Sequence, residues 1–318
     1  MRSNHHVFQH LIARCSGLEP ITVAVAFPCD EVSLLGALEA ARQRLIVPTL
    51  VGPRPQILAT AKTLGEDVSI YRIVDAETAE DAAAQAVALC RKAECAALMK
   101  GSLHTDVLMH EVLKADTGLH GARRVSHVFV MDVPNYPKLL LITDAAINIY
   151  PSLEEKVDIV QNAIDLAHVL GIAQPKVAIL SAVETVTPKI ASTIEAAALC
   201  KMADRGQIQG GVVDGPLAFD NAVSIRAARI KHIVSPVAGQ ADILVVPDLE
   251  SGNMLAKQLE YLADAESAGI VLGARVPIVL TSRADSAKAR LASCAVMALL
   301  AHAGRRSQSA QRIEGSER

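Results

Sequence analysis

The sequence predicts an α/β protein with largely parallel sheets, arranged in two successive parts. Short runs rich in β-branched residues alternate with longer segments of helical period, which is the pattern of βαβ units. With 318 residues, of which 51% are hydrophobic, the chain is long enough for two cores. Between residues 125 and 143, two apolar runs joined by a Pro-Asn-Tyr-Pro turn interrupt the alternation, so we expect an antiparallel strand pair and a domain boundary there.

The elements follow in order along the chain. In the first part we expect strands 22–27, 46–51, 68–74 and 96–99 and helices 33–44, 55–64 and 78–91. The antiparallel pair is 126–133 with 138–143. In the second part we expect helices 153–170, 188–202, 253–262 and 287–300 and strands 177–180, 212–214, 243–246, 270–272 and 277–281. Residues 304–318 are poor in apolar side chains, which predicts a disordered tail.

Composition argues against several partners and compartments. With four Phe, four Tyr and no Trp, the chain lacks stacking platforms for nucleic acid, and its net charge of -3 does not attract phosphate backbones. No long uncharged apolar run predicts a membrane span, and the polar start does not resemble an export signal. The six Cys form no C-x-x-C pair, so we expect reduced thiols, a cytoplasmic protein, and neither nucleic-acid nor membrane partners.

Several common catalytic motifs are missing from the sequence. Among the 18 glycines no two are spaced as G-x-G, so the dinucleotide-binding fingerprint is absent. The P-loop, the G-x-S-x-G elbow and the H-E-x-x-H helix are absent as well. These absences disfavour Rossmann dehydrogenases, P-loop kinases, serine hydrolases of the elbow type and zincins.

The strongest candidate for a reactive site is the sequence Ser-Arg-Ala-Asp-Ser at residues 282–286, between an apolar strand and a long helix. Ser282 can donate to a developing oxyanion, Arg283 can bind two phosphate oxygens at once, and Asp285 can accept a proton. The carboxyl end of a strand, beside helix N–H groups, is where α/β sheets bind anions. In the alternative interpretation Asp285 or Ser286 only caps the helix, and Arg283 is a solvated surface charge.

A second candidate anion site follows the fourth predicted strand. Gly101, Ser102, His104 and Thr105 lie in a turn before a helix, where backbone and side-chain donors can surround a phosphate. In the alternative interpretation Thr105 or Asp106 is an ordinary N-cap and His104 is a loop residue.

Polar residues also follow strands in the second part. Asp144 and Asn148 bracket apolar residues after the strand 138–143, which indicates either the wall of a cleft or a buried hydrogen-bond network. Asp220 lies in a turn, and its spacing leaves the role of the carboxylate open.

The loop after the strand 243–246 opens a helix with Gly252 and Asn253, and Lys257 lies one turn further on. A loop of this kind can hold a ligand or can simply turn the chain.

Taken in order, these segments resemble the phosphate acetyl/butyryl transferase family over residues 8–302. The likeness is closest to the phosphate acetyltransferase portion of bifunctional enoyl-CoA hydratase/phosphate acetyltransferase proteins, which share a Pro-Cys-Asp-Glu-Val-Ser-Leu stretch like residues 28–34. The segments that carry the resemblance are Lys-Gly-Ser at 100–102, Ile-Thr-Asp-Ala-Ala-Ile-Asn at 142–148, Asp-Gly-Pro-Leu-Ala-Phe-Asp at 214–220, residues 237–248, Ser-Gly-Asn-Met at 251–254 with Lys257, and residues 282–286.

The resemblance implies two α/β domains of the three-layer αβα, isocitrate/isopropylmalate dehydrogenase-like type. The first is expected at 1–128 plus 272–303 and the second at 129–271. The resemblance also implies a homodimer, no cofactor and no metal, with coenzyme A, acyl-CoA, phosphate and acyl phosphate as substrates. Transfer would be direct, without an acyl-enzyme.

By the same resemblance, Ser282 hydrogen-bonds to the acyl carbonyl and Arg283 holds the phosphate. Typical phosphate acetyltransferases place an Asp base seven residues after this Ser, where the chain has Ala289, and Asp285 is our substitute for that base. The residues expected to bind substrate are Gly101, Ser102, His104, Thr105, Asp144, Asn148, Asp220, Gly252, Asn253 and Lys257.

Acetyl is the acyl group that we expect first. The Ser-Arg-Ala-Asp-Ser version of the motif is closer to phosphate butyryltransferases, so a longer chain is the alternative. A scaffold that binds coenzyme A without catalysis, as a sensor, is an alternative of another class. A metal- and NAD-dependent oxidoreductase on the same fold would need a cluster of Asp residues that the sequence does not contain.

Overall fold

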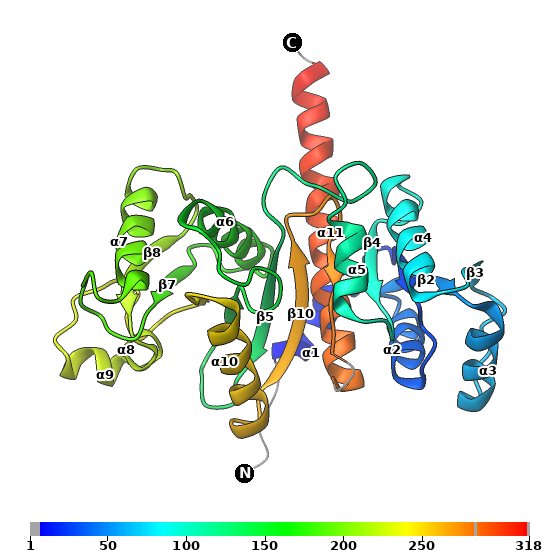
Figure 1. The fold of residues 1–318 in the computed structure, drawn as a ribbon, viewed down its shortest axis with the longest axis horizontal. Helices are drawn as coiled ribbons and strands as arrows, with labels where there is room; N and C mark the ends of the chain where they lie inside the picture. Colours follow the sequence, from blue (N-terminus) through cyan, green and yellow to red (C-terminus); the bar gives the residue numbers. More distant parts are fainter. Residues whose placement is uncertain (1–6, 283–284, 317–318) are drawn as a thin grey trace. The chain divides into compact units, whose positions relative to one another are not determined.

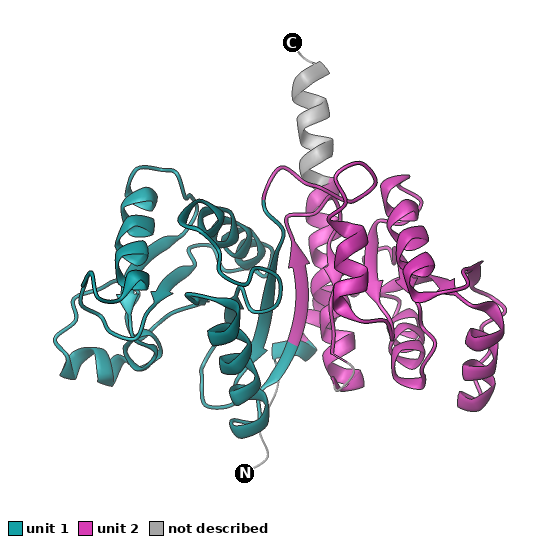
Figure 2. Cartoon of the chain, viewed as in Figure 1, with its two compact units in different colours: residues 1–9, 124–267 teal, residues 10–123, 268–318 magenta. Residues whose placement is uncertain are grey.

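A computed structural model describes residues 7–282 and 285–316, with side chains as far as Arg305. The chain divides into two compact units (Figure 2): unit 1 is Met1–Gln9 with Arg124–Ser267, and unit 2 is His10–Arg123 with Ala268–Arg318. The predicted domain boundaries, after residues 128 and 271, lie a few residues later than those of the units, and the predicted first domain included Met1–Gln9, which belongs to unit 1. Arg124 already contacts unit 1, where its backbone N–H donates to the Asp158 carboxylate at 2.8 Å.

Unit 2 is built on a sheet with the order β3-β2-β1-β4-β11-β10. All neighbours are parallel except β10 and β11, which are antiparallel. Its strands are β1 (Ile21–Ala26), β2 (Ile46–Gly52), β3 (Arg72–Asp75), β4 (Ala97–Lys100), β10 (Glu266–Leu272) and β11 (Ile278–Val279). Because β1, β4 and β11 run in one direction, the loops that follow them leave the same edge of the sheet.

The helices of unit 2 connect these strands (Figure 1). They are α2 (Glu31–Arg42), α3 (Arg54–Leu64), α4 (Ala79–Arg91), α5 (Thr105–Val112) and α11 (Ala287–Ser316), and α1 (Val7–Arg14) precedes them. Helix α11 packs against α2, so a segment that follows unit 1 in the chain completes the unit that begins at His10.

Unit 1 has a sheet with the order β5-β6-β9-β7-β8. Only β5 and β6 are antiparallel, and the other neighbours are parallel. The strands are β5 (Ser126–Asp132), β6 (Leu140–Thr143), β7 (Lys176–Leu180), β8 (Val212–Leu217) and β9 (Ile243–Val245). The helices are α6 (Leu153–Val169), α7 (Ala191–Asp204), α8 (Phe219–Val223), α9 (Ile225–Ile230) and α10 (Leu249–Leu262).

The predicted α/β class and the antiparallel pair are confirmed, since β5 and β6 pair with Val128 opposite Thr143. Strand β3 begins at Arg72, later than the expected residue 68. The Asp67 side chain accepts a hydrogen bond from the Ser69 N–H at 2.8 Å and holds the preceding residues in a turn.

Two helices differ most from their predicted ranges, while α2 and α7 are shifted by two or three residues. Helix α10 begins at Leu249, before the expected residue 253, because the Asp248 carboxylate accepts a hydrogen bond from the Ser251 N–H at 2.8 Å and caps the helix there. Helix α11 continues to Ser316 through the stretch that we expected to be disordered. Ala, Gln, Arg and Glu in that stretch favour helix even without burial, and no Pro interrupts it. Within the described residues, no helix has the length and apolar character needed to cross a bilayer.

Three strands are buried along their whole length. Every residue of β4, β5 and β6 is buried, including the polar His127, Asp132 and Thr143 of β5 and β6. Strands covered on both sides by helices are expected to be buried in this way. The buried polar groups among them therefore need partners within the protein.

Several helices begin at side-chain caps, and the most complete one starts α6. The Ser152 hydroxyl accepts from the Glu155 N–H at 3.3 Å, and the Glu155 carboxylate accepts from the Ser152 N–H at 2.8 Å. This reciprocal arrangement satisfies two N–H groups that a helix otherwise leaves open.

Replacing Ser152 with Ala should lower the free energy of unfolding by about 1 kcal/mol, because one helix N–H loses its acceptor. Urea denaturation followed by circular dichroism measures the change. A Ser152→Asp control keeps an oxygen acceptor and should stay within about 0.5 kcal/mol of the parent protein. Equal losses in both variants would contradict the capping role.

Candidate functional site

The predicted site residues fall into two groups, one in each unit. In unit 1, Asp144, Asn148, Gly252 and Asn253 lie around residues 144–148, which we call the Asp144 loop. In unit 2, the predicted residues lie in the loops after β4 and β11.

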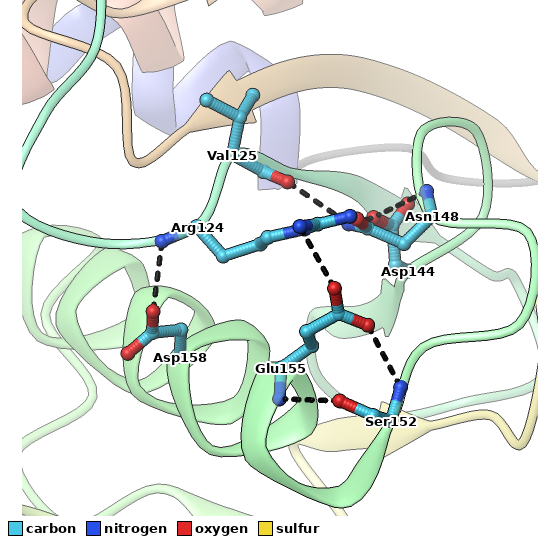
Figure 3. A network of polar contacts seen from close by, with 7 residues as sticks. All are labelled: Arg124, Val125, Asp144, Asn148, Ser152, Glu155 and Asp158. Atoms are coloured by element: carbon cyan, nitrogen blue, oxygen red, sulfur yellow. Dashed lines mark hydrogen bonds and ion pairs between the residues drawn. The ribbon is translucent and has the colours of Figure 1, made fainter.

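The Asp144 carboxylate is the centre of its loop, and its residue is only 3% exposed. One oxygen accepts from the Ala146 N–H at 3.0 Å and the Ile147 N–H at 3.1 Å; the other accepts from the Asn148 N–H at 3.2 Å and side-chain amide at 2.6 Å (Figure 3). Burial raises the pKa of Asp144, and these hydrogen bonds lower it in part. Of the two interpretations of the sequence, the buried hydrogen-bond network is the one that these contacts support.

Arg124 extends this network and was not among the predicted residues. Its Nε donates to the Asn148 Oδ1 at 2.8 Å, and its Nη1 lies 2.8 Å from the Glu155 carboxylate (Figure 3). Asn148 also donates to the Val125 carbonyl at 2.9 Å. The network therefore ties the Asp144 loop to β5 and to the capped start of α6. The adjacent Arg123 and Arg124 before a strand were the available signal in the sequence.

The start of α10 packs directly on the Asp144 loop. A Cβ on Gly252 would lie 2.9 Å from the Asp144 carbonyl oxygen and 3.1 Å from the Ala145 Cα. The Asn253 side chain donates to the Ala145 carbonyl at 3.3 Å. Only a glycine permits so close an approach without a shift, which accounts for the Ser-Gly-Asn sequence at this point.

Lys257 lies one turn further along α10, against β5. Its ammonium is 2.6 Å from the Glu260 carboxylate and 5.7 Å from the centre of the Phe129 ring. His127 packs edge-on against the same ring, with the centroids 4.5 Å apart. Burial, helped by the charge on Lys257, lowers the pKa of His127 to about 3, so this imidazole is neutral near pH 7.

Asp220 is placed differently from the other unit 1 residues. It lies in α8, its carboxylate is 3.1 Å from the Lys231 ammonium, and the same ammonium is 3.3 Å from Glu184. Asp220 therefore shares one surface cation with Glu184, and its role in substrate binding stays a prediction.

A pocket of about 790 Å³ in unit 1 lies where β7 and β9 end. Phe219 and Leu259 are among its mostly apolar lining, and Ser181, Ser192 and Ser251 contribute hydroxyls. The described residues that line it include none of the predicted site residues and no charged group, so it offers no cation for a phosphate.

In unit 2 the loops after β1 and β4 touch through their backbones. A Cβ on Gly101 would lie 2.4 Å from the Ala26 carbonyl oxygen and 2.5 Å from that of Phe27. The Ser102 hydroxyl donates to the Phe27 carbonyl at 2.8 Å and accepts from the Cys29 N–H at 3.4 Å. Gly101 is thus required by the close approach, and Ser102 holds the β1 loop in place.

His104 and Thr105 stand at the start of α5. His104 is the N-cap residue, without a capping bond from its side chain, and Thr105 is the first residue of the helix. The alternative that Thr105 or Asp106 is the N-cap is therefore wrong. His104 is exposed, while Lys100 is buried and donates to the Leu103 carbonyl at 3.1 Å.

The loop after β11 brings Ser282 and Asp285 together. The Asp285 carboxylate accepts from the Ser282 N–H at 2.7 Å, and the Asp285 N–H donates to the Ser282 carbonyl at 3.2 Å. The Ser286 hydroxyl accepts from the Ala289 N–H at 3.1 Å and so caps α11. Arg283 lies outside the described residues. The capping interpretation thus holds for Ser286, whereas Asp285 braces the turn.

Comparison with known proteins places these loops in one family. The model of the family described as Phosphate acetyl/butaryl transferase matches residues 76–298. A phosphate acetyltransferase from Rhizobium meliloti is 62% identical over 303 residues, which cover 95% of this chain and 96% of that protein. A phosphate butyryltransferase from Clostridium acetobutylicum is 42% identical over 294 residues, covering 92% of this chain and 98% of that protein.

A solved structure agrees with the sequence relatives. A phosphotransacetylase from Streptococcus pyogenes superposes with a TM-score of 0.78 at 25% identity, covering 94% of this chain and 99% of that chain. The αβα fold that the family resemblance predicted is therefore confirmed.

Replacing Gly252 with Ala should lower the free energy of unfolding by about 1–3 kcal/mol, since the new methyl group meets the backbone of the Asp144 loop. Gly304→Ala is the matched control, because Gly304 lies in α11 with nothing within 4 Å of its added Cβ. That variant should gain up to about 1 kcal/mol from helix propensity. Thermal unfolding measures both, and equal stabilisation would show that the Asp144 loop does not restrict α10.

Proposed function

The chain belongs to the phosphate acetyl/butyryl transferase family, and we propose that it transfers a short acyl group reversibly between coenzyme A and inorganic phosphate. Acetyl is the proposed acyl group, so the reaction is acetyl-CoA plus phosphate giving acetyl phosphate plus coenzyme A. The observation that carries the proposal is the 62% identity to a phosphate acetyltransferase over 95% of this chain.

The chemistry requires a tetrahedral oxyanion. In the direction of acyl-CoA synthesis, the coenzyme A thiolate attacks the carbonyl carbon of the acyl phosphate, and the carbonyl electrons move to oxygen. Collapse of this intermediate breaks the bond between that carbon and the phosphate oxygen, and phosphate leaves. A donor at the oxyanion and a cation at the phosphate lower the barrier. We assign these roles to Ser282 and Arg283.

The base that removes the thiol proton is proposed to be Asp285. The position seven residues after Ser282 is Ala289, whose methyl group cannot accept a proton. Asp285 is the nearest described carboxylate along the loop, and its hydrogen bond from the Ser282 N–H keeps it beside the proposed oxyanion donor, at 2.7 Å. The remaining predicted residues of both units are proposed to bind the substrates.

A longer acyl chain is the second candidate. It is supported by the 42% identity to a phosphate butyryltransferase over 92% of this chain. Coenzyme A binding without catalysis is the candidate of another class, motivated by Ala289. We further propose that the protein is a cytoplasmic homodimer that needs neither metal nor cofactor, as the resemblance implied.

The purified protein in chelator should form thioester from coenzyme A and acetyl phosphate, and more slowly from butyryl phosphate. Arg283→Ala should lower kcat/KM by about 100-fold or more, because a charged contact to the transferred group is lost. The control Arg72→Ala removes a surface cation that pairs with Glu94 at 2.8 Å and should leave the rate unchanged.

Faster turnover of butyryl phosphate would assign the longer acyl chain instead. If calorimetry detects coenzyme A binding but neither donor is turned over, the proposed acyltransferase activity is contradicted. That result would favour a protein that binds coenzyme A as a sensor.

A further inference from the structure

Arg290 is a buried cation that the proposed chemistry does not use. It lies in the first turns of α11 and is only 2% exposed. Its Nη1 donates to the Thr281 hydroxyl at 2.8 Å, and its Nη2 donates to the Ser282 carbonyl at 2.7 Å. Both acceptors belong to the loop after β11, so the guanidinium lies directly beneath the residue assigned to the oxyanion.

These contacts leave little freedom to the backbone of Ser282. Its N–H donates to Asp285 at 2.7 Å and its carbonyl accepts from Arg290 at 2.7 Å. With both backbone groups of the residue held, the direction in which its side chain leaves the backbone is fixed. Arg290 supplies one of the two restraints from inside the core.

Two features of the structure around Arg290 lower the stability of the fold. Its Nε is buried and has no hydrogen-bond partner, so the cost of removing this N–H from water is not recovered. Gly36 lies inside α2, where an Ala would favour the helix, but a Cβ there would lie 2.7 Å from the Arg290 Cδ. An apolar residue at position 290 would remove the unpartnered Nε, whereas a side chain of similar length would keep the close contact with Gly36. A buried polar group left without a partner is often found at functional sites.

The charge of Arg290 is balanced by the loops around it. Burial lowers the pKa of Arg290, while Asp285 and Asp30 raise it, and an arginine stays protonated under these conditions. Asp30 follows β1 and caps α2, and Asp285 follows β11. The guanidinium thus interacts electrostatically with the loops that follow β1 and β11, the two strands on either side of β4.

We propose that Arg290 is a positioning residue, which fixes the backbone of Ser282 so that its hydroxyl points at the developing oxyanion. This inference rests on the proposed function and deepens it. Arg290 touches no substrate in this role; it acts through Thr281 and Ser282. A displacement of about 1 Å at a reacting group can cost about 100-fold in rate.

The test compares Arg290→Met, Arg290→Lys and Gly36→Ala with the parent enzyme in the coenzyme A and acetyl phosphate assay. Arg290→Met should lower kcat about 100-fold and change KM less than about 3-fold, because substrate contacts remain. Arg290→Lys keeps the charge but loses the two-pronged geometry, so its kcat should lie in between. Gly36→Ala pushes on the Arg290 side chain and should lower kcat while Arg290 is still present.

The control is Arg42→Met, also an Arg to Met change, at a side chain in α2 that is 45% exposed. Its kcat and KM should match those of the parent. Melting temperatures are measured for every variant, because a merely structural role would lower stability and leave kcat per folded molecule unchanged. Folded Arg290→Met with the parent kcat overturns the proposal.

If Arg290→Met does not fold, the proposal is tested with Gly36→Ala and Thr281→Val. The second of these variants removes one hydrogen-bond acceptor of Arg290. Parent kcat in both folded variants overturns the proposal, and reduced kcat at constant KM supports it. A parent enzyme that turns over neither acyl phosphate contradicts the proposed function itself, and the role of Arg290 falls with it. Failure of the proposed function is therefore seen in the parent enzyme, whereas failure of the proposed role of Arg290 is seen only in the variants.

Discussion

The four hydrogen bonds accepted by the Asp144 carboxylate set the arrangement of the unit 1 site. A carboxylate this deeply buried would cost several kcal/mol without donors, so the loop has to wrap around it. The wrapped loop then offers the carbonyls of Asp144 and Ala145 to α10, which approaches them through Gly252 and Asn253. The position of Lys257, one turn later, follows from that approach.

In both units, the loops at the ends of the strands lie in close backbone contact with a neighbouring segment. Each brings a loop into backbone contact with its neighbour, through Gly101 in unit 2 and Gly252 in unit 1, and each then fixes that loop with a polar side chain. Close backbone contact leaves no room for a Cβ but allows N–H groups and hydroxyls to converge on a small anion. The two glycines therefore belong to the geometry of the loops, rather than to their flexibility.

Sequence reasoning predicted the local features and missed the long-range ones. Hydrophobic periodicity and turn residues predicted the strands and the antiparallel pair. Turn residues and the family resemblance predicted the loops of Ser102, Asp144 and Ser282. All of these signals are properties of short segments. Arg124 was missed because its partners Asn148 and Glu155 come from a later segment of the chain, so no local spacing reveals them. Arg290 was missed although its partners Thr281 and Ser282 precede it closely, because a basic residue in the first turns of a helix is usually a solvated surface charge.

The division of unit 2 into residues 10–123 and 268–318 has a consequence for biosynthesis. The ribosome completes β1 to β4 early, but β11 pairs with β4 only after the whole of unit 1 has been made. Until then one side of β4 presents unpaired backbone groups to other nascent chains, a surface that promotes misassembly. This exposure ends only when residues 268–318 have emerged from the ribosome and β11 pairs with β4.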